Sequence, residues 1–387
     1  MRRLRIVVGS GALVLVSACS AGQAGSASSP APAGSTAPAS SSAQSPAAAQ
    51  ASTHSTAATP LATSRPKAAP GTSVTVAAVG DTMLGNTPDL PPDPGAYYDA
   101  VRPELDRNTQ IVFGNLEGTL TTAAGSKCGK NEGTTCFAFH DPPGYARYFR
   151  QAGFTVLNDA NNHSFDFGAA GQAQTVRSIH SAGMSQTGLP GEITLVKAKG
   201  VTFAFLAFAP YQYTASLLDL PTAQALIRRA AREANVVVVY MHAGAEGSDA
   251  DHVTGREEDY LGEDRGNPEA FAHMAINAGA SLVLASGPHV LRGMQFYKGH
   301  LIAYSLGDFA NYGDFSLAGI LDTSAILHVT LSSAGGFEGA RIYPVLLAGQ
   351  GKPVPGGGAV DFISRLSAED FGASAARISS SGVITRP

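Results

Sequence analysis

Short apolar runs alternate with longer amphipathic segments along most of this chain, from residue 73 onward. The runs have the length and β-branched content of buried strands, and the segments between them have helical spacing. Strands that alternate with helices and end in antiparallel hairpins predict an α/β domain whose sheets are flanked by helices. The expected strands are 73–79, 110–113, 153–157, 195–197, 201–208, 236–241, 281–285, 294–297, 300–304, 325–331 and 340–347, and the expected helices are 97–106, 143–152, 169–182, 222–233, 267–278 and 362–366.

Polar side chains follow five of these strands, at the point where each strand ends. The densest set lies at 158–166, which reads Asn-Asp-Ala-Asn-Asn-His-Ser-Phe-Asp. In open α/β sheets the ligand-binding crevice lies outside the carboxyl ends of the strands, so we expect these side chains to meet there. One such residue is commonly a helix cap or a turn residue, but that explanation does not account for five ends together. The candidates are Asp81, Asn115, Glu117, Asn162, His163, His242 and His289.

This mixture of carboxylate, carboxamide and imidazole groups predicts a site for one or two divalent metal ions. Manganese, zinc, iron or magnesium suits such ligands better than a soft metal does. Two-metal hydrolases use a clustered set of this kind to hold a phosphoryl or carbonyl oxygen and to activate water. The polar, acidic stretch 247–266 is expected to be a surface loop or a lid.

The amino-terminal part of the chain differs from the rest in composition. Residues 1–5 are positively charged, residues 6–15 are apolar, and Val-Ser-Ala leads into Cys19, which predicts a bacterial export signal at 1–19. Val-Ser-Ala-Cys resembles a lipobox, whose cysteine is lipidated and becomes the new amino terminus; an ordinary signal peptide is the alternative. Residues 20–70 are mostly Ala, Ser, Gly, Thr, Pro and Gln and predict a disordered tether. The folded domain, 71–387, would then stand on the extracellular face of the cell membrane.

The two remaining cysteines and the overall charge fit this location. Cys128 and Cys136 lie in a Gly/Lys/Thr-rich loop, and in an oxidising compartment such a pair is expected to form a local disulfide. A zinc site would need closer spacing and further ligands. The net charge of −4 and the lack of a basic run with interleaved aromatic residues argue against nucleic acid as a partner.

Taken in chain order, the motifs at the strand ends resemble those of the CapA family. This family is named for poly-γ-glutamate capsule synthesis and belongs to the calcineurin-like metallophosphoesterase superfamily. The resemblance covers the folded part from Val74 to the C-terminus and implies a four-layer α/β/β/α sandwich of metallophosphoesterase type. The motifs are Val79-Gly-Asp-Thr-Met83, Gly114-Asn-Leu-Glu117, Asn161-Asn-His-Ser-Phe-Asp-Phe-Gly168, His242-Ala-Gly-Ala-Glu246, Pro288-His-Val-Leu291 and Tyr304-Ser-Leu-Gly-Asp-Phe309.

The resemblance also implies a ligand set. Asn115 or Glu117 stands where the superfamily has its bridging aspartate. Met83 and Gly287 stand where the phosphoesterase pattern has histidines. The implied metal ligands are Asp81, Asn115, Glu117, Asn162, His242 and His289.

The remaining implied roles concern catalysis and substrate binding. The implied catalytic residues are His163 and Asn162, of which His163 would be the general acid or a substrate-facing group. Glu246 and Asp308 would lie on the substrate side of the site. Arg292 is a candidate anion clamp, and a surface arginine is the alternative.

Two functions fit these expectations. The first is a metal-dependent hydrolase of a phosphoester or an amide-linked polymer, acting in capsule or poly-γ-glutamate biosynthesis. The second is a noncatalytic polyanion-binding or export factor on the same fold. The expected partners are an anionic polymer or phosphoester substrate, the membrane through a lipid anchor, and other capsule-synthesis proteins.

Overall fold

The computed structural model of this protein describes residue 66, residues 69–131, residue 133 and residues 136–387. The predicted export signal, the lipidation site Cys19 and nearly all of the predicted tether lie outside the described residues. Within the part of the chain that is described, no helix has the length and apolar character needed to cross a bilayer.

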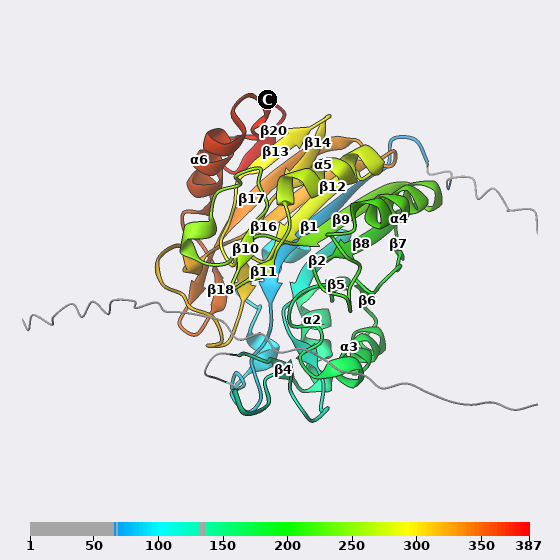
Figure 1. The fold of residues 1–387 in the computed structure, drawn as a ribbon. Coiled ribbons are helices and arrows are strands. Elements are labelled where there is room, and N and C mark those ends of the chain that lie inside the picture. Colours follow the sequence, from blue (N-terminus) through cyan, green and yellow to red (C-terminus); the bar gives the residue numbers. More distant parts are fainter. Residues whose placement is uncertain (1–65, 67–68, 132, 134–135) are drawn as a thin grey trace, which may run out of the picture. The chain divides into compact units, whose positions relative to one another are not determined.

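Two stacked β-sheets form the centre of the domain (Figure 1). The larger sheet contains, in spatial order, β19 (Arg377–Ile378), β20 (Val383–Thr385), β17 (Phe337–Ala348), β16 (Thr323–Ser332), β1 (Ser73–Thr82), β2 (Ile111–Leu116), β5 (Val156–Asn158) and β6 (Ser185–Thr187), while β15 (Asp308–Ala310) pairs with β1 and β18 (Lys352–Pro355) with β17. The smaller sheet contains β13 (Met294–Tyr297), β14 (His300–Ala303), β12 (Leu282–Ser286), β9 (Val236–His242), β8 (Val201–Phe208) and β7 (Thr194–Ala198).

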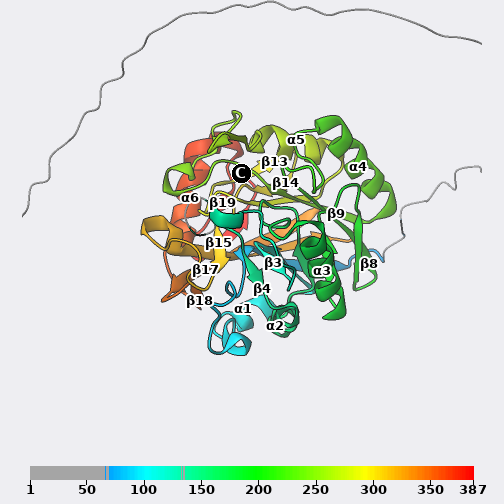
Figure 2. The same ribbon diagram turned by 60° about the horizontal axis from the view of Figure 1, so that its bottom comes forward.

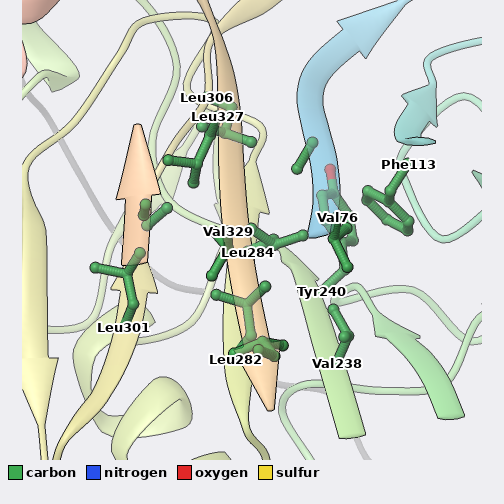
Figure 3. Packing of buried hydrophobic residues seen from close by; sticks show 14 of the residues in the cluster. Val76, Phe113, Val238, Tyr240, Leu282, Leu284, Leu301, Leu306, Leu327 and Val329 are labelled. Atoms are coloured by element: carbon green, nitrogen blue, oxygen red, sulfur yellow. The ribbon is translucent and has the colours of Figure 1, made fainter. Parts of the chain in front are cut away.

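Apolar side chains from both sheets fill the space between them (Figure 3). Val76 and Phe113 come from the larger sheet. Val238 and Leu284 come from the smaller sheet, and the ring of Phe205 stacks on that of Phe113 at 5.7 Å. Every residue of β8 and of β9 is buried. Their nearly continuous apolar sequences are explained by this position, because helices cover the other face of the smaller sheet.

Helices cover the two outer faces (Figure 2). α1 (Arg102–Asp106), α2 (Ala146–Ala152) and α3 (Gly168–Ser181) pack on the larger sheet, and α4 (Leu220–Glu233) and α5 (Pro268–Ala278) pack on the smaller one. α6 (Ala359–Phe371) lies against β13 and β17. The four-layer α/β/β/α sandwich is therefore confirmed.

The shorter elements are η1 (Pro94–Ala96), β3 (Thr119–Leu120), η2 (Gly129–Asn131), β4 (His140–Asp141), η3 (Pro143–Tyr145), η4 (Ser248–Ala250), β10 (Asp259–Tyr260), β11 (Glu263–Asp264), η5 (Gly319–Asp322) and η6 (Gly372–Ser374).

Three of the differences from the predicted elements have a clear physical reason or bear on the site. The helix predicted at 97–106 is α-helical only in α1, because Pro103 is tolerated only in the first turn of a helix. β6 was not predicted, since Ser-Gln-Thr lacks the apolar pattern of a strand and pairs as an extension of β5. β15 was also missed, and its pairing with β1 places Asp308 beside Asp81.

Candidate metal centre

The carboxyl ends of strands from both sheets meet at one edge of the sandwich. In the larger sheet the register of β1 and β2 places Asp81 beside Asn115. In the smaller sheet His242, at the end of β9, pairs with Ser286 at the end of β12. The Ser286 hydroxyl donates a hydrogen bond to Asp81 Oδ1, which joins the two sheets at this point.

Two groups of potential ligands overlap at Asp81. In one group Asp81 lies with His289 and Asp308, and in the other with Glu117 and His242; within each group the ligand atoms lie within 4.8 Å of one another. His289 Nδ1 is 2.7 Å from Asp308 Oδ1 and 3.4 Å from Asp81 Oδ2. His242 Nε2 is 3.6 Å from Glu117 Oε1. Asp81 could therefore be a ligand to one ion in each of the two groups.

The two carboxylates Asp81 and Glu117 are held by Asn115. Its Nδ2 donates to Asp81 Oδ1 at 2.6 Å and to Glu117 Oε2. Its Oδ1 accepts from Asn158 at 2.5 Å and from Asn161 at 2.9 Å. The expectation that Asn115 is itself a ligand does not fit this geometry, because its oxygen is already used twice and its amide donors orient the neighbouring carboxylates.

Several buried atoms at this edge have no hydrogen-bond partner among the described residues. Buried polar groups are nearly always paired, so a cluster of unpaired ones needs an explanation. A divalent cation would provide it, since carboxylate, carboxamide and imidazole are its usual ligands. The residues present therefore fit a metal ion. The unpaired atoms are Asp81 Oδ2, Glu117 Oε1, Asn162 Oδ1, His242 Nε2 and Asp308 Oδ2.

The pKa shifts of the buried ionisable side chains also favour a bound cation. Burial, together with the nearby Asp308 carboxylate, raises the pKa of Asp81 to about 6. Burial and then the Asp81 carboxylate raise the pKa of Glu117 well above its usual value. Burial lowers the pKa of His242 well below its usual value, so its imidazole is neutral, as a metal ligand must be. The ionised forms of these buried carboxylates are therefore disfavoured without a counter-charge, and a cation would stabilise them.

His289 is the positively charged member of the cluster in this state. Burial opposes protonation, but the carboxylates of Asp308, Asp81 and Glu246 raise the pKa of His289 well above its usual value. Its backbone has a φ of 61°, a conformation that costs on the order of 1–3 kcal/mol and that concentrates at functional sites. A cation bound here would replace the proton.

His163 lies at the side of the cluster and is held by a hydrogen-bonded chain. Its Nδ1 is 2.8 Å from Asp166 Oδ2, and Lys127 Nζ is 2.7 Å from Asp166 Oδ1. The ring packs against Phe139, with centroids 4.5 Å apart. Burial lowers the pKa of His163, against the opposite effect of Asp166.

The structure adds Asp166 and Lys127 to the residues expected from sequence. Asp166 lies three positions after His163, a spacing that suits a turn contact. Lys127 carried no sequence signal beyond its place next to Cys128. The structure joins Cys128 and Cys136 in a disulfide in the loop that holds this lysine.

The cluster opens into a cleft of about 780 Å³. Its lining includes Asn162, His163, Glu246, His289 and Asp308. The stretch 247–266 borders the cleft as a surface segment and carries the hairpin of β10 and β11.

Arg292 does not occupy the position expected of it. Its side chain is 1% exposed, and its two terminal nitrogens bond Glu258 at 3.1 and 2.7 Å. Its Nε donates to the carbonyl of Ala250 at 2.6 Å. Each nitrogen of the guanidinium thus has a partner inside the protein, and the residue lies outside the cleft lining, so Arg292 is neither an anion clamp nor a surface residue.

Two curated relatives share sequence with this chain. PGA biosynthesis protein CapA of Bacillus subtilis (strain 168) is 28% identical over 256 residues, which cover 61% of this chain and 63% of the relative. Capsule biosynthesis protein CapA of Bacillus anthracis is 28% identical over 261 residues, covering 61% and 59%. The chain therefore spans less than two thirds of the length of these relatives.

Two solved structures are similar at low identity. The 5'-nucleotidase precursor from Thermus thermophilus is 15% identical with a TM-score of 0.38, covering 71% of this chain and 54% of that one. GAP50, the anchor in the inner membrane complex of Plasmodium, is 12% identical with a TM-score of 0.33, covering 80% and 98%.

A family profile matches the part of the chain that contains the candidate ligands. The profile described as bacterial capsule synthesis protein PGA_cap matches residues 75–312. This region is more than half of the 387 residues and includes all the candidate ligands from Asp81 to Asp308. The chain therefore belongs to the bacterial capsule synthesis protein PGA_cap family, as its resemblance to CapA proteins predicted.

Proposed function

We propose that this protein is an exported, membrane-anchored capsule-synthesis protein whose domain is a metal-dependent hydrolase. Its substrate is a phosphoester or an amide-linked polymer of capsule or poly-γ-glutamate biosynthesis. The observation that supports hydrolysis is the pair of ligand groups that share Asp81, with unpaired buried atoms in both. The family and the names of the two Bacillus relatives support the pathway.

The ligands would divide between two positions. Asp81, His289 and Asp308 would hold one ion, and Asp81, Glu117 and His242 the other. Asn162 Oδ1, which is buried and unpaired, is available to either. Bound manganese, zinc, iron or magnesium would polarise a phosphoryl or carbonyl oxygen and make water a stronger nucleophile.

His163 is the group in the cleft lining that is placed to move a proton. Asp166 holds its Nδ1, so Nε2 is the ring atom left to exchange a proton with a bound substrate. Lys127 fixes Asp166 from the other side and donates to the carbonyl of Asn162 at 3.0 Å. Together these contacts orient the imidazole.

His163→Asn tests the proposal. Metal-loaded wild-type protein is expected to hydrolyse a phosphoester or a γ-glutamyl amide, and the variant should lose about 10²- to 10⁴-fold in kcat, the usual contribution of one general acid or base. Metal content, measured by mass spectrometry, should not change. His180→Asn, at an exposed histidine of α3, is the control and should leave kcat unaltered.

A fully metal-loaded wild type without turnover on either substrate class would contradict hydrolysis. The noncatalytic polyanion-binding or export role would then remain. The charges of the cleft do not favour that role, because Lys127 and Arg265 are already paired with carboxylates of the protein.

The membrane anchor and the assembly with other capsule-synthesis proteins are part of the same proposal. Cys19 within Val-Ser-Ala-Cys is the proposed lipidation site. Cys19→Ser is expected to move the full chain from the membrane fraction to the medium or the soluble envelope fraction. An unchanged membrane fraction would show that something other than Cys19 holds the protein.

A further inference from the structure

The cleft has two chemically different parts. Its lining includes the candidate ligands Asn162, His289 and Asp308, and it also includes apolar and aromatic side chains, among them Phe137, Leu261, Phe315 and Leu321. The following inference rests on the proposed function, because it names the substrate class for the same site.

Two of the apolar side chains stand exposed at the cleft. Among the described residues, six large hydrophobic side chains are exposed, and Phe137 (55%) and Leu261 (88%) are the two that line this cleft. They come from loops more than one hundred residues apart in sequence. Single exposed apolar residues are ordinary, but two that line the same cleft offer apolar surface to a ligand bound there.

The turn that carries Leu261 does not itself require a leucine. Leu261 and Gly262 join β10 to β11 with φ values of 52° and 82°. Two-residue turns of this kind favour Asn-Gly or Gly-Gly, because both central residues need positive φ. Two other hairpins of this protein have the same geometry and place Lys199 and Lys298 at this position. A leucine in the left-handed conformation and in water is therefore better explained by a ligand than by the fold.

The charged groups of the cleft are poorly suited to a polyanion. Lys127 is paired with Asp166 at 2.7 Å, and Arg265 is paired with Glu246 at 2.8 Å and with Glu263 at 3.2 Å. Both cations are thus already neutralised within the protein.

Carboxylates outnumber these cations in the cleft lining. They are Glu246, Glu263, Asp308 and Asp314. Away from the metal ions, a chain of carboxylates would find no unpaired cation among the described lining residues, because Lys127, Arg265 and His289 each already pair with a carboxylate of the protein; an uncharged apolar chain needs no such partner.

We propose that the substrate is an amphipathic phosphoester whose phosphate lies at the ligand cluster and whose apolar chain lies along Phe137 and Leu261. The apolar rim, formed by these two side chains, removes part of the chain from water, and the metal centre binds the phosphate. Such a substrate is a phosphorylated lipid or isoprenoid carrier rather than a free polycarboxylate.

A series of n-alkylphosphonates from methyl to decyl tests this inference, because they keep the charged head constant and are not hydrolysed. Binding to the full chain would be measured by calorimetry, with manganese and without it. The affinity is expected to rise about two- to fourfold for each added methylene until the rim is covered, as for partial to full burial of a CH₂ group.

Two variants remove the rim without removing a buried side chain. Leu261→Asn keeps the turn geometry, and Phe137→Ser removes an exposed ring; both should flatten the dependence on chain length and leave methylphosphonate binding unaltered. Leu195→Ser, at a half-exposed leucine of β7 outside the cleft lining, is the matched control and should behave as wild type. Equal thermal unfolding midpoints would show that all three variants are folded.

Affinity that does not depend on chain length, or tighter binding of γ-glutamyl oligomers than of decylphosphonate, would overturn the inference. Its failure is distinguishable from failure of the proposed function. Hydrolysis of short phosphoesters without an effect of chain length on binding would support the hydrolase activity and contradict the amphipathic substrate. Chain-length-dependent binding without turnover would support an amphipathic phosphate ligand and contradict hydrolysis.

Discussion

Asp81→Asn is expected to lower the metal content of the protein to less than about a tenth of the wild-type value. Replacing groups that only support a ligand already costs about 10- to 100-fold in metal affinity, and Asp81 would be a ligand in both positions. The change keeps the shape of the side chain, and its Oδ1 position keeps the neighbours Asn115 and Ser286. Mass spectrometry after reloading with manganese and with zinc measures the result.

Variants of the unshared ligands separate the two positions. Glu117→Gln and Asp308→Asn each affect only one ligand group and should each lose at most the ion of that group. Asp159→Asn is the matched control: it is fully buried beside β5, both its oxygens are unpaired, and it belongs to neither group. A control that loses as much metal as Asp81→Asn would show that the losses report general damage.

The stability of the metal-free protein gives an independent readout. Chelation should lower the unfolding midpoint of wild type, since a ligand that binds only the folded state stabilises it. The Asp81→Asn protein should not respond to chelation. Without metal it should be at least as stable as wild type, because it has one fewer buried carboxylate beside Glu117 and Asp308. A wild type that ignores the chelator would contradict a bound ion.

Arg292→Met is expected to destabilise the fold by about 3–5 kcal/mol, because it leaves the Glu258 carboxylate buried without its partner. Glu258 is 9% exposed and receives both terminal nitrogens of Arg292. Urea unfolding followed by circular dichroism measures the loss. Metal content and phosphonate affinity should change little, since Arg292 is outside the cleft lining.

The double variant Arg292→Met with Glu258→Leu separates pairing from packing. Apolar replacement of both partners of a buried ion pair is often neutral or stabilising, so most of the lost stability should return. The Ala245 amide, which donates to Glu258 at 2.9 Å, would lose its acceptor and limit the recovery. A stable Arg292→Met protein with weakened phosphonate binding would instead restore the role of anion clamp.

Sequence reasoning predicted the strands that build the site because each is a buried run with its own local pattern. β1, β2, β5, β9 and β12 lie within about three residues of their predicted bounds. The polar residues at their ends meet, as parallel strands require. The resemblance to CapA proteins supplied the layer order, which no local pattern contains.

The partners of the polar side chains could not be read from sequence. Asn115 bonds residues up to 46 positions away, and Arg292 meets Glu258 34 positions away. Lys127 reaches Asp166 from a loop whose composition predicts only irregular structure. These contacts depend on strand register and on the stacking of two sheets, because a shift of one residue reverses the direction of every side chain in a strand.

By itself, the sequence of this protein determined the α/β class, the main strands in their order along the chain, and the kinds of ligand atom at their carboxyl ends. Only the tertiary structure decided that Asp81 is common to two ligand groups, that Asn115 orients carboxylates and that Phe137 and Leu261 share a cleft. Local propensity and hydrophobic period act over a few residues, whereas a site is assembled by packing between segments that are distant in the chain.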